Sequence, residues 1–258
     1  MSAPVRALFY KESREGRWKY IVAALVLIAL AIATPLLYDM LVGLLGEFLA
    51  DESIPAEFRR LVPPGALELP VYLWANWHGK TLYQMMVLFA LIFGASTVAG
   101  EFSRGSAPFV FSRAVRRRTV VLVKTAVDLG ALALIALAST AALDVTARIA
   151  HGYAAPWTYY GALIPIMAGT AFVYGLSLLM STRFDDPVKA GAAAAAVAAL
   201  FSIPTLVPAW RRWSVYVHMT GSTLLASGTF PWGSVLVIAA LAALLLAAAC
   251  VSLERRDI

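Results

Sequence analysis

Six long runs of apolar residues, separated by shorter polar segments, dominate this chain of 258 residues. The runs cover residues 20–38, 82–100, 120–143, 160–180, 188–207 and 235–251. A helix needs about 20 apolar residues to cross the hydrocarbon core of a bilayer, and each run is close to that length. The runs are continuous and rich in Leu, Ala and Val, which favours helices over the alternating strands of a barrel. The pattern predicts an all-α polytopic membrane protein with six transmembrane helices.

The segment before the first run carries a helical pattern of its own. Residues 1–17 place Val5, Leu8 and Phe9 at helical spacing, with charged residues at the positions between them. This pattern predicts a basic amphipathic helix lying on the inner leaflet. An ordinary positively charged anchor is the alternative, and the two interpretations are compatible.

Two of the segments predicted to lie outside the membrane are also apolar in part. Residues 39–49 have helical periodicity and predict a short interfacial helix, followed by a turn at residues 63–65. Trp74 and Trp77 are expected in the outer aromatic belt. Residues 208–232 are too apolar for a free loop, so we expect short outer or re-entrant helices before the sixth span.

The Lys and Arg residues are distributed unevenly between the two sides of the predicted membrane domain. With the N-terminus placed inside, the inner segments hold 15 of them and the outer segments 6, which together make the 21 of the chain. The positive-inside rule then places both termini in the cytoplasm and the protein in the cytoplasmic (inner) membrane. Because these residues lie at span ends, the net charge of +6 indicates topology and a lipid-bilayer partner, with no nucleic acid.

Composition and missing motifs exclude several classes of protein. Charged residues make up 14% of the chain, below the roughly 25% of soluble domains, so residues 1–258 are expected to form a single membrane domain. The chain has no Gly-x-x-x-x-Gly-Lys-Ser/Thr loop for ATP and no His-Glu-x-x-His motif. Cys250 is the single cysteine, and the three histidines, all predicted outside, are far apart. We therefore expect no enzyme activity, no metal site and no cofactor in this chain.

The most specific pattern lies between the second and third apolar runs. Glu101 ends the second run, Gly105 follows four residues later, and Ser106 comes next. A short apolar stretch precedes an arginine cluster at residues 113–118, and Lys124 enters the third run. This order predicts a rigid, amphipathic segment that faces inward, where its aromatic side chains can fill a groove on a partner.

This segment resembles the type-2 ATP-binding-cassette (ABC) permease family. Members of that family carry a Glu, a Gly-Thr four and five residues later, a Leu-rich turn, a Pro, an Arg, and a Gly-Lys pair that starts span three. Glu101, Gly105 and Lys124 occupy the matching positions in this chain, and Ser106 replaces the Thr.

Two positions depart from the family pattern, because Ala114 stands where a Pro is typical and Val123 where a Gly is typical. The departures affect the shape of the turn rather than its position. Elsewhere, residues 11–17 resemble the family's N-terminal connecting helix, and residues 254–257 resemble its short basic tail. The layout of six spans is also similar over the whole chain.

The resemblance implies a coupling helix between spans two and three, which docks on a separate ATP-binding-cassette ATPase subunit. The residues expected at that contact are Glu101, Phe102, Arg104, Gly105, Phe109 and Arg113. The residues expected on the connecting helix are Lys11, Glu12 and Arg14. The implied protein is the permease subunit of an exporter, paired with a second copy or a sister permease, while ATP and Mg bind the ATPase subunit.

The sequence gives only a broad class for the substrate and two interpretations of the arginine cluster. Few charges line the spans, which favours an amphipathic, lipid-like or drug-like substrate. Residues 116–118 can equally serve only to fix topology and to contact anionic lipid. A different function, a membrane anchor or sensor whose outer segments bind a partner, is the alternative to transport.

Two further features concern the packing of the spans. Asp128 lies one turn past Lys124, so the two are expected to form an intramembrane ion pair. Gly191, Ala195 and Ala199 recur every four residues along span five, a pattern that lets helices approach closely. That stripe predicts either a contact within the subunit or a seam between two subunits.

Overall fold

A computed structural model of the protein describes residues 3–51, 53, 55, 57, 65–111 and 116–256. These residues form helices, and no strand occurs among them. Six helical segments are long and apolar enough to cross a membrane: Arg17–Leu36, Leu69–Ser103, Arg117–His151, Trp157–Ser181, Pro187–Leu206 and Trp232–Glu254. The chain is thus a multi-pass membrane protein, and the predicted all-α class with six spans is confirmed.

The helices follow one another along the chain with short connections between most of them. The first half comprises α1 (Ala3–Glu15), α2 (Arg17–Leu36), α3 (Tyr38–Ala50), α5 (Leu69–Asn76), the π-helix η1 (Trp77–Leu82), α6 (Tyr83–Ser103), α7 (Ala107–Phe111) and α8 (Arg117–His151). The second half comprises α9 (Trp157–Gly161), α10 (Leu163–Ser181), α11 (Pro187–Leu200), α12 (Ile203–Leu206), the 3-10 helix η2 (Pro208–Trp213), α13 (Val215–Met219), α14 (Ser222–Ser227) and α15 (Trp232–Glu254).

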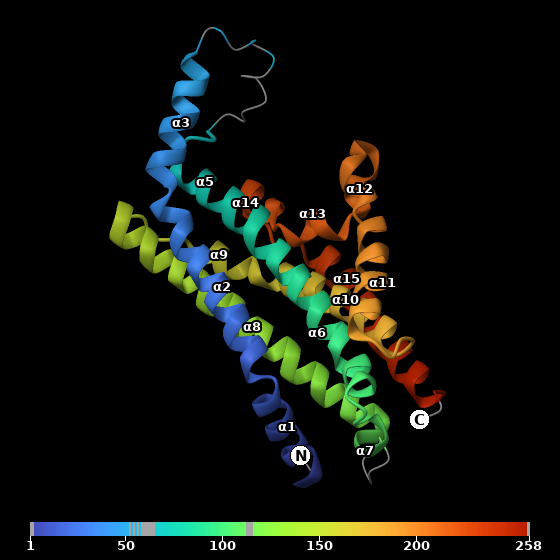
Figure 1. Cartoon of the computed structure of the whole chain (residues 1–258). Coiled ribbons are helices and arrows are strands. Elements are labelled where there is room, and N and C mark those ends of the chain that lie inside the picture. The colour runs from blue at the N-terminus through green and yellow to red at the C-terminus, as the bar shows by residue number, and fades with distance from the viewer. Residues whose placement is uncertain are drawn as a thin grey trace.

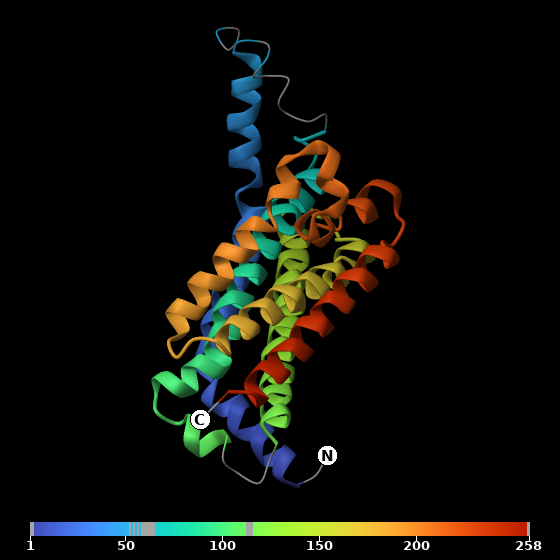
Figure 2. The same cartoon turned by 90° about the vertical axis from the view of Figure 1, so that its right-hand side faces the viewer.

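Both ends of the chain lie at the same end of the helix bundle, beside α1 and α7 (Figure 1). We refer to this end, formed by α1, the connection through α7 and the last turn of α15, as the charged end. The opposite end carries α3, α12 and the short helices α13 and α14 (Figures 1 and 2). The predicted cytoplasmic position of the charged end remains a prediction.

Helix α10 forms the centre of the bundle and packs against α6, α11 and α15, while α2 packs on α8 (Figure 2). In the most apolar stretch of the span that contains α10, 61% of the residues are buried, compared with 17% for the span that contains α11. The outer faces of α2, α11 and α15 expose Leu, Val and Ile side chains. Such faces suit contact with lipid, which is as apolar as the side chains themselves.

Local sequence signals explain where some helices begin and end. The Asp186 carboxylate accepts hydrogen bonds from the amides of Val188 (2.8 Å) and Lys189 (2.9 Å), and Pro187 takes the first helical position of α11. Gly152 follows the last residue of α8 and caps the helix in a left-handed conformation, with a φ of 66°, which glycine adopts more easily than other residues. These signals fix the polar connections that flank the apolar spans.

The contact between α6 and α10 is unusually close at Gly94. A Cβ added to Gly94 would lie 2.8 Å from the Ser177 Cβ and 2.8 Å from the Tyr174 carbonyl oxygen. One turn further, the Ser181 hydroxyl donates to the Ala95 carbonyl at 2.7 Å. A small residue and a hydroxyl on facing helices are the usual means of close helix packing in membranes.

The predicted outer aromatic belt at Trp74 and Trp77 is wrong, because both side chains are buried inside the bundle. The second span begins earlier than the apolar run indicated, at α5, and continues through the π-helical turn of η1. The Trp77 indole donates to the Thr140 hydroxyl at 3.2 Å. His78, also expected outside, is buried with its Nε2 2.9 Å from the Tyr159 carbonyl oxygen.

The other outer segments form helices where helices were expected. Residues 39–49 lie in α3, which continues beyond the bundle in the direction of α2 (Figures 1 and 2). Residues 208–232 contain η2, α13 and α14. Tyr216 of α13 is buried against the bundle, and this burial raises the pKa of its phenol to about 12. The position of these helices relative to a membrane surface remains a prediction. Of the expected turn at residues 63–65, only Gly65 lies within the described residues.

The contact between α11 and α6 uses small residues that are offset from the predicted stripe by one position. Ala195 and Ala199 of that stripe are exposed. The alanines of α11 that are buried are Ala190, Ala194 and Ala198. Ala190 packs in one cluster with Ala95 and Ala99 of α6. The stripe at Gly191 and Ala195 instead faces an open groove.

We predict that Gly94→Ala lowers the free energy of unfolding by about 1–3 kcal/mol, because the added methyl group overpacks the contact with α10. Gly130→Ala is the matched control, since a Cβ there would meet none of the described atoms within 4 Å. The control should leave stability unchanged or raise it by about 0.5–1 kcal/mol. Thermal unfolding in detergent micelles measures both, and equal stability of the two variants would contradict the packing described.

Candidate functional site

Glu101, in the last turn of α6, is the centre of a buried polar cluster and is 2% exposed. Its carboxylate accepts hydrogen bonds from Lys124 Nζ at 2.7 Å, from Arg104 at 3.2 Å, and from the Ser106 hydroxyl. Lys124, on α8, also pairs with the Glu12 carboxylate of α1 at 2.9 Å. One lysine thus bridges two carboxylates and joins α1, α6 and α8.

The turn after α6 explains why Gly and Ser follow Glu101 at this spacing. Gly105 has a φ of +70°, and its amide donates to the Phe102 carbonyl at 2.9 Å. The Ser106 amide donates to the Glu101 carbonyl at 2.9 Å. This pair of bonds is a Schellman motif, which needs a left-handed residue at the glycine position. Ser106 therefore closes the turn with its backbone and contacts the Glu101 carboxylate with its side chain.

A second cluster surrounds Asp128, one turn further along α8. Its carboxylate accepts hydrogen bonds from Lys19 Nζ (2.6 Å) and the Tyr20 hydroxyl (2.6 Å), both on α2. The Tyr174 hydroxyl of α10 donates to the same carboxylate at 3.0 Å. Asp128 thereby connects α2, α8 and α10 where an unpaired charge would be costly.

The two clusters correct the predicted ion pair between Lys124 and Asp128, because each residue has different partners. Side chains on a helix point back toward its N-terminus. Lys124 therefore extends toward the start of α8, where Glu12 and Glu101 lie, and away from Asp128. Lys19 of α2 takes the place that Lys124 was expected to occupy.

The side chains of both clusters balance in formal charge. Buried charges are tolerated when they are paired and hydrogen-bonded. The negative side chains are Glu12, Glu101 and Asp128, and the positive ones are Lys19, Arg104 and Lys124. Removing any one of them leaves a net charge in the two clusters.

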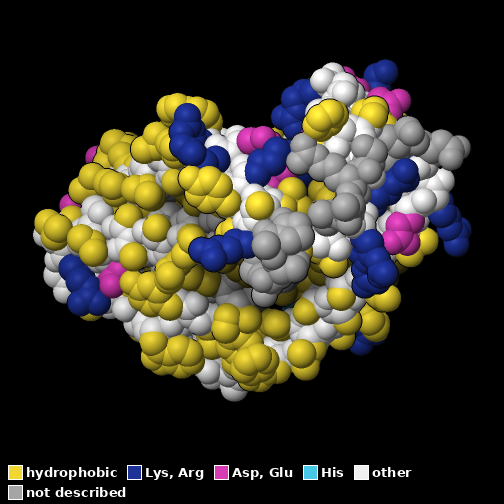
Figure 3. Space-filling view, turned by 90° about the horizontal axis from the view of Figure 1, so that it is seen from below, with side chains coloured by type: hydrophobic (Ala, Val, Ile, Leu, Met, Phe, Trp, Pro, Cys, Tyr) yellow, Lys and Arg dark blue, Asp and Glu magenta, His cyan; other side chains and the backbone are white. Residues whose placement is uncertain are grey.

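A cavity of about 330 Å³ opens beside the two clusters, and we call it the charged cavity. Helices α1, α2, α6 and α8 form its walls. The lining residues are Glu12, Glu15, Gly16, Lys19, Tyr20, Ile92, Ser96, Thr97, Arg104, Lys124 and Asp128. Seen from below, this end of the molecule carries basic side chains with acidic ones among them, and hydrophobic side chains cover the flanks (Figure 3).

The aromatic residues expected to contact a partner lie in two different environments. Phe111 is buried and stacks on Phe102, with ring centroids 6.4 Å apart. The Arg256 guanidinium lies 3.8 Å from the centroid of the Phe102 ring. Phe109, which lies between them in the sequence, is 70% exposed on α7. Phe102 and Phe111 therefore hold α7 against the bundle, while most of the Phe109 side chain lies at the surface.

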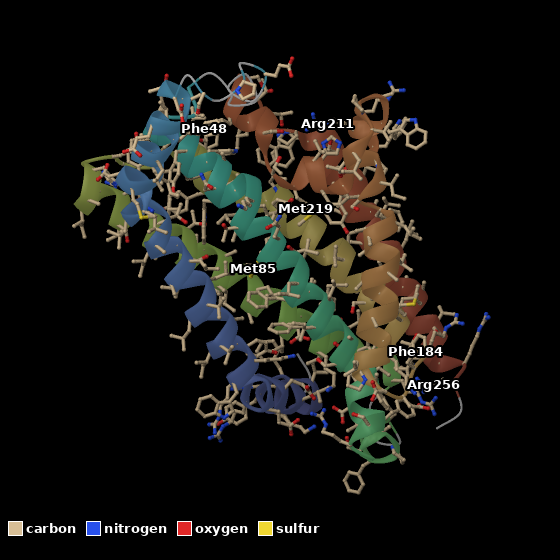
Figure 4. All side chains as sticks on the ribbon, turned by 45° about the horizontal axis from the view of Figure 1, so that its top comes forward. Phe48, Met85, Phe184, Arg211, Met219 and Arg256 are labelled. Atoms are coloured by element: carbon tan, nitrogen blue, oxygen red, sulfur yellow. The ribbon has the colours of Figure 1, made fainter. Side chains whose placement is uncertain are left out.

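Arg256 ties the end of the chain to the neighbouring connections, a role that the sequence alone did not reveal. Its Nη1 donates to the carbonyls of Thr182 (2.8 Å) and Phe184 (3.4 Å), and it pairs with Asp185. Arg256 and Phe184 lie together at the lower right of Figure 4. The Arg117 side chain at the start of α8 donates to the Arg256 carbonyl at 2.7 Å.

The remaining predicted site residues are less central. Lys11 pairs with Glu15 at 3.3 Å on the surface of α1, and Arg14 lies over the Tyr10 ring at 5.5 Å. Arg113 lies outside the described residues. The predicted set also omitted Lys19, Tyr20 and Tyr174. The only sequence signal for the first two was a basic residue and a phenol at the start of span one.

Comparison with known proteins places this site within a sequence family. Residues 65–258, more than half of the chain, match the family described as Protein of unknown function (DUF2705). No curated protein matches the chain. The matched region contains Glu101, Lys124, Asp128 and Arg256, whereas Glu12 and the other contributions of α1 and α2 lie outside it.

We predict that the Glu101–Lys124 contact has a large coupling energy. Glu101→Gln removes one charge from the neutral cluster and should lower the free energy of unfolding by about 3 kcal/mol. Lys124→Met leaves two carboxylates without their lysine and should cost about 3–5 kcal/mol. In the double variant the effects should overlap, giving a coupling of about 1–3 kcal/mol in detergent unfolding.

The ion pair of Asp144 with Arg148 at the opposite end is the matched control for this cycle. The two side chains meet at 2.9 Å, but Arg148 is about half exposed, so the pair should couple by no more than about 1 kcal/mol. A coupling at Glu101 that is no larger than the control would refute a structural role for the cluster.

Proposed function

The chain belongs to the DUF2705 family, and we propose that it is the permease subunit of an ABC exporter. A separate ATP-binding-cassette subunit binds ATP and Mg and supplies the energy. This chain supplies the membrane path, together with a second copy or a sister permease. The segment from Glu101 to Phe111 is the element that receives force from the ATPase subunit.

One observation carries this proposal: the segment is attached to the bundle at both ends and carries an exposed aromatic residue between them. Glu101 fastens its beginning to Lys124, and Phe111 is buried at its other end. Phe109, between the two, is 70% exposed on α7. A displacement of α7 by a bound partner is therefore passed on to the spans instead of being absorbed by a flexible loop.

The contacts around the segment define where such a displacement goes. Through Lys124 it reaches Glu12 and therefore α1. Through the stacking of Phe102 with Arg256 it reaches the end of α15 and the connection between α10 and α11. Closure of the ATPase subunits would thus move α1, α6, α8 and α15 together, which is the coordinated change that a transporter needs.

The charge distribution favours an amphipathic, lipid-like or drug-like substrate. The ionised side chains of the spans gather near their ends, where they pair with one another. The middle of each span contributes apolar or small residues to the surface. A strongly charged solute would find no counter-ions along most of the described spans.

The test is to purify the protein from its native membranes in a mild detergent and to identify what accompanies it. We expect an ATP-binding-cassette subunit in about equal amount. Because Glu101 is buried, Glu101→Ala would weaken the fold as well as the coupling. Phe109→Ala is therefore the sharper variant, and it should lower retention of the ATPase subunit about tenfold, as removal of an aromatic anchor does at other interfaces.

Trp157→Ala is the control for this experiment. Trp157 is 68% exposed, like Phe109, but lies in α9 away from the charged end. Its replacement should leave retention unchanged. A preparation with no ATPase subunit, under conditions that preserve other transporter complexes, would support the anchor or sensor function, for which α3 offers an exposed outer surface.

A further inference from the structure

The charged cavity lies next to an apolar groove between α6 and α11. This groove has a volume of about 440 Å³. Its lining residues are Leu88, Leu91, Ile92, Ala95, Ser96, Pro187, Val188, Gly191, Ala192 and Ala195. Ile92 and Ser96 line both the groove and the charged cavity. The two hollows therefore lie on either side of these two side chains, and a molecule that occupies both must cross Ile92 and Ser96.

The polarity of this combined site changes along α6 in one direction. The groove begins at Leu88, near the middle of the span, and the cavity extends to Arg104, just past its end. At 1.5 Å per residue, the two positions are about 24 Å apart along the helix. Along α6 the apolar part thus lies deeper in the span than the charged part, as do the chains and headgroup of a lipid in one leaflet, while on α11 the groove extends to the first residue of the helix, Pro187.

The cavity contains a buried acceptor that lacks a donor. Glu12 is 9% exposed, and among the described residues its Oε1 atom has no hydrogen-bond partner. Lys11 Nζ lies 3.6 Å from this atom, which is too far for a hydrogen bond, and Lys124 donates to the other oxygen of the carboxylate. A buried acceptor of this kind is costly unless a donor reaches it. Glu15, which is about half exposed and pairs with Lys11, adds a second carboxylate to the same wall.

The cavity also offers donors to an anionic group. Lys19 and Arg104 line it, and each keeps part of its side chain exposed while it pairs with Asp128 or Glu101. An ammonium has three donors and a guanidinium five, so both retain donors after these contacts. The cavity can therefore accept one positive and one negative group on the same molecule.

We propose that the charged cavity and the apolar groove together bind a phospholipid whose headgroup carries a primary amine. The ammonium donates to Glu12 Oε1 and contacts Glu15, the phosphate contacts Lys19 and Arg104, and an acyl chain lies along the groove. The binding site is independent of the proposed function. Its role as the site of the exported cargo rests on that function.

The chemistry of the site distinguishes this headgroup from other common ones. A quaternary ammonium has no N–H group and leaves Glu12 Oε1 without a donor. An anionic headgroup without an amine meets two carboxylates and gains nothing from them. The charged cavity, which would hold the headgroup, has a volume of about 330 Å³, at the lower end of the range for small-molecule pockets.

The test is native mass spectrometry of the purified protein with lipids of identical chains. Phosphatidylethanolamine should bind about tenfold more tightly than phosphatidylcholine or phosphatidylglycerol, since charge-assisted hydrogen bonds are the strong ones. Glycerophosphoethanolamine, which has the headgroup without the chains, should bind at least about tenfold more weakly than the lipid, because it forfeits the groove.

Two variants test the location of the site. Ile92→Trp fills the junction of the two hollows and should weaken phosphatidylethanolamine binding about tenfold, while Leu134→Trp on α8 should have no effect. Both positions are exposed, at 52% and 68%, so neither change disturbs the core. Glu15→Gln should lower the preference for the primary amine about threefold without loss of folding.

Each outcome decides the matter. Equal binding of phosphatidylethanolamine and phosphatidylcholine, or binding that survives Ile92→Trp, would overturn the proposal. A change of oligomeric state in Ile92→Trp without any change in lipid binding would also overturn it, and would assign the groove to a second copy. Selective binding in a preparation that never retains an ATPase subunit would support the site and remove its role in export.

Discussion

Lys124 and the carboxylates around it are the interaction on which the arrangement of the charged end depends. Glu12, Glu101 and Lys124 come from three different helices, and each is buried. A buried charge is tolerated only while its partners are in place, so the three helices cannot separate without exposing or orphaning a charge. The position of α1 against α8 follows from this requirement more than from apolar contact, because much of α1 remains exposed.

The turn after α6 extends the same constraint to α7. Gly105 permits the backbone to reverse, and Ser106 binds both the carbonyl and the carboxylate of Glu101. Phe102 and Phe111 then pack together beneath Arg256. Backbone geometry, charge pairing and aromatic packing therefore all act on one short segment. This is why a contact made at Phe109 is expected to reach the spans.

The sequence predicted the spans well because the length of a bilayer-crossing helix is fixed by the bilayer. The sequence singled out Gly105 only by its place in a family pattern, and its left-handed backbone became apparent only in the turn after α6. The prediction from sequence failed at Trp74, Trp77 and His78, since aromatic and polar residues near a span end are typical of a membrane surface and carry no sign of a π-helical turn.

The partners of charged residues could not be derived from spacing alone. Lys124 and Asp128 share a helix face, but the ion pairs that form connect residues far apart in the chain, such as Lys19 with Asp128. The predicted stripe at Gly191 and Ala195 lies one residue away from the alanines of α11 that are buried. Small residues occur on every face of α11, so the sequence of this helix does not show which of them packs on Ala95. That choice depends on how α6 approaches α11, which is again a long-range contact.

Hydrogen–deuterium exchange of the intact protein and of Glu101→Gln in detergent tests the central claim most directly. If the cluster holds the charged end together, the variant will lose amide protection in α1 and in α7 as well as around residue 101. Loss of protection confined to residues 101–106, with α1 unchanged, would show that α1 is held by other contacts and would contradict the account.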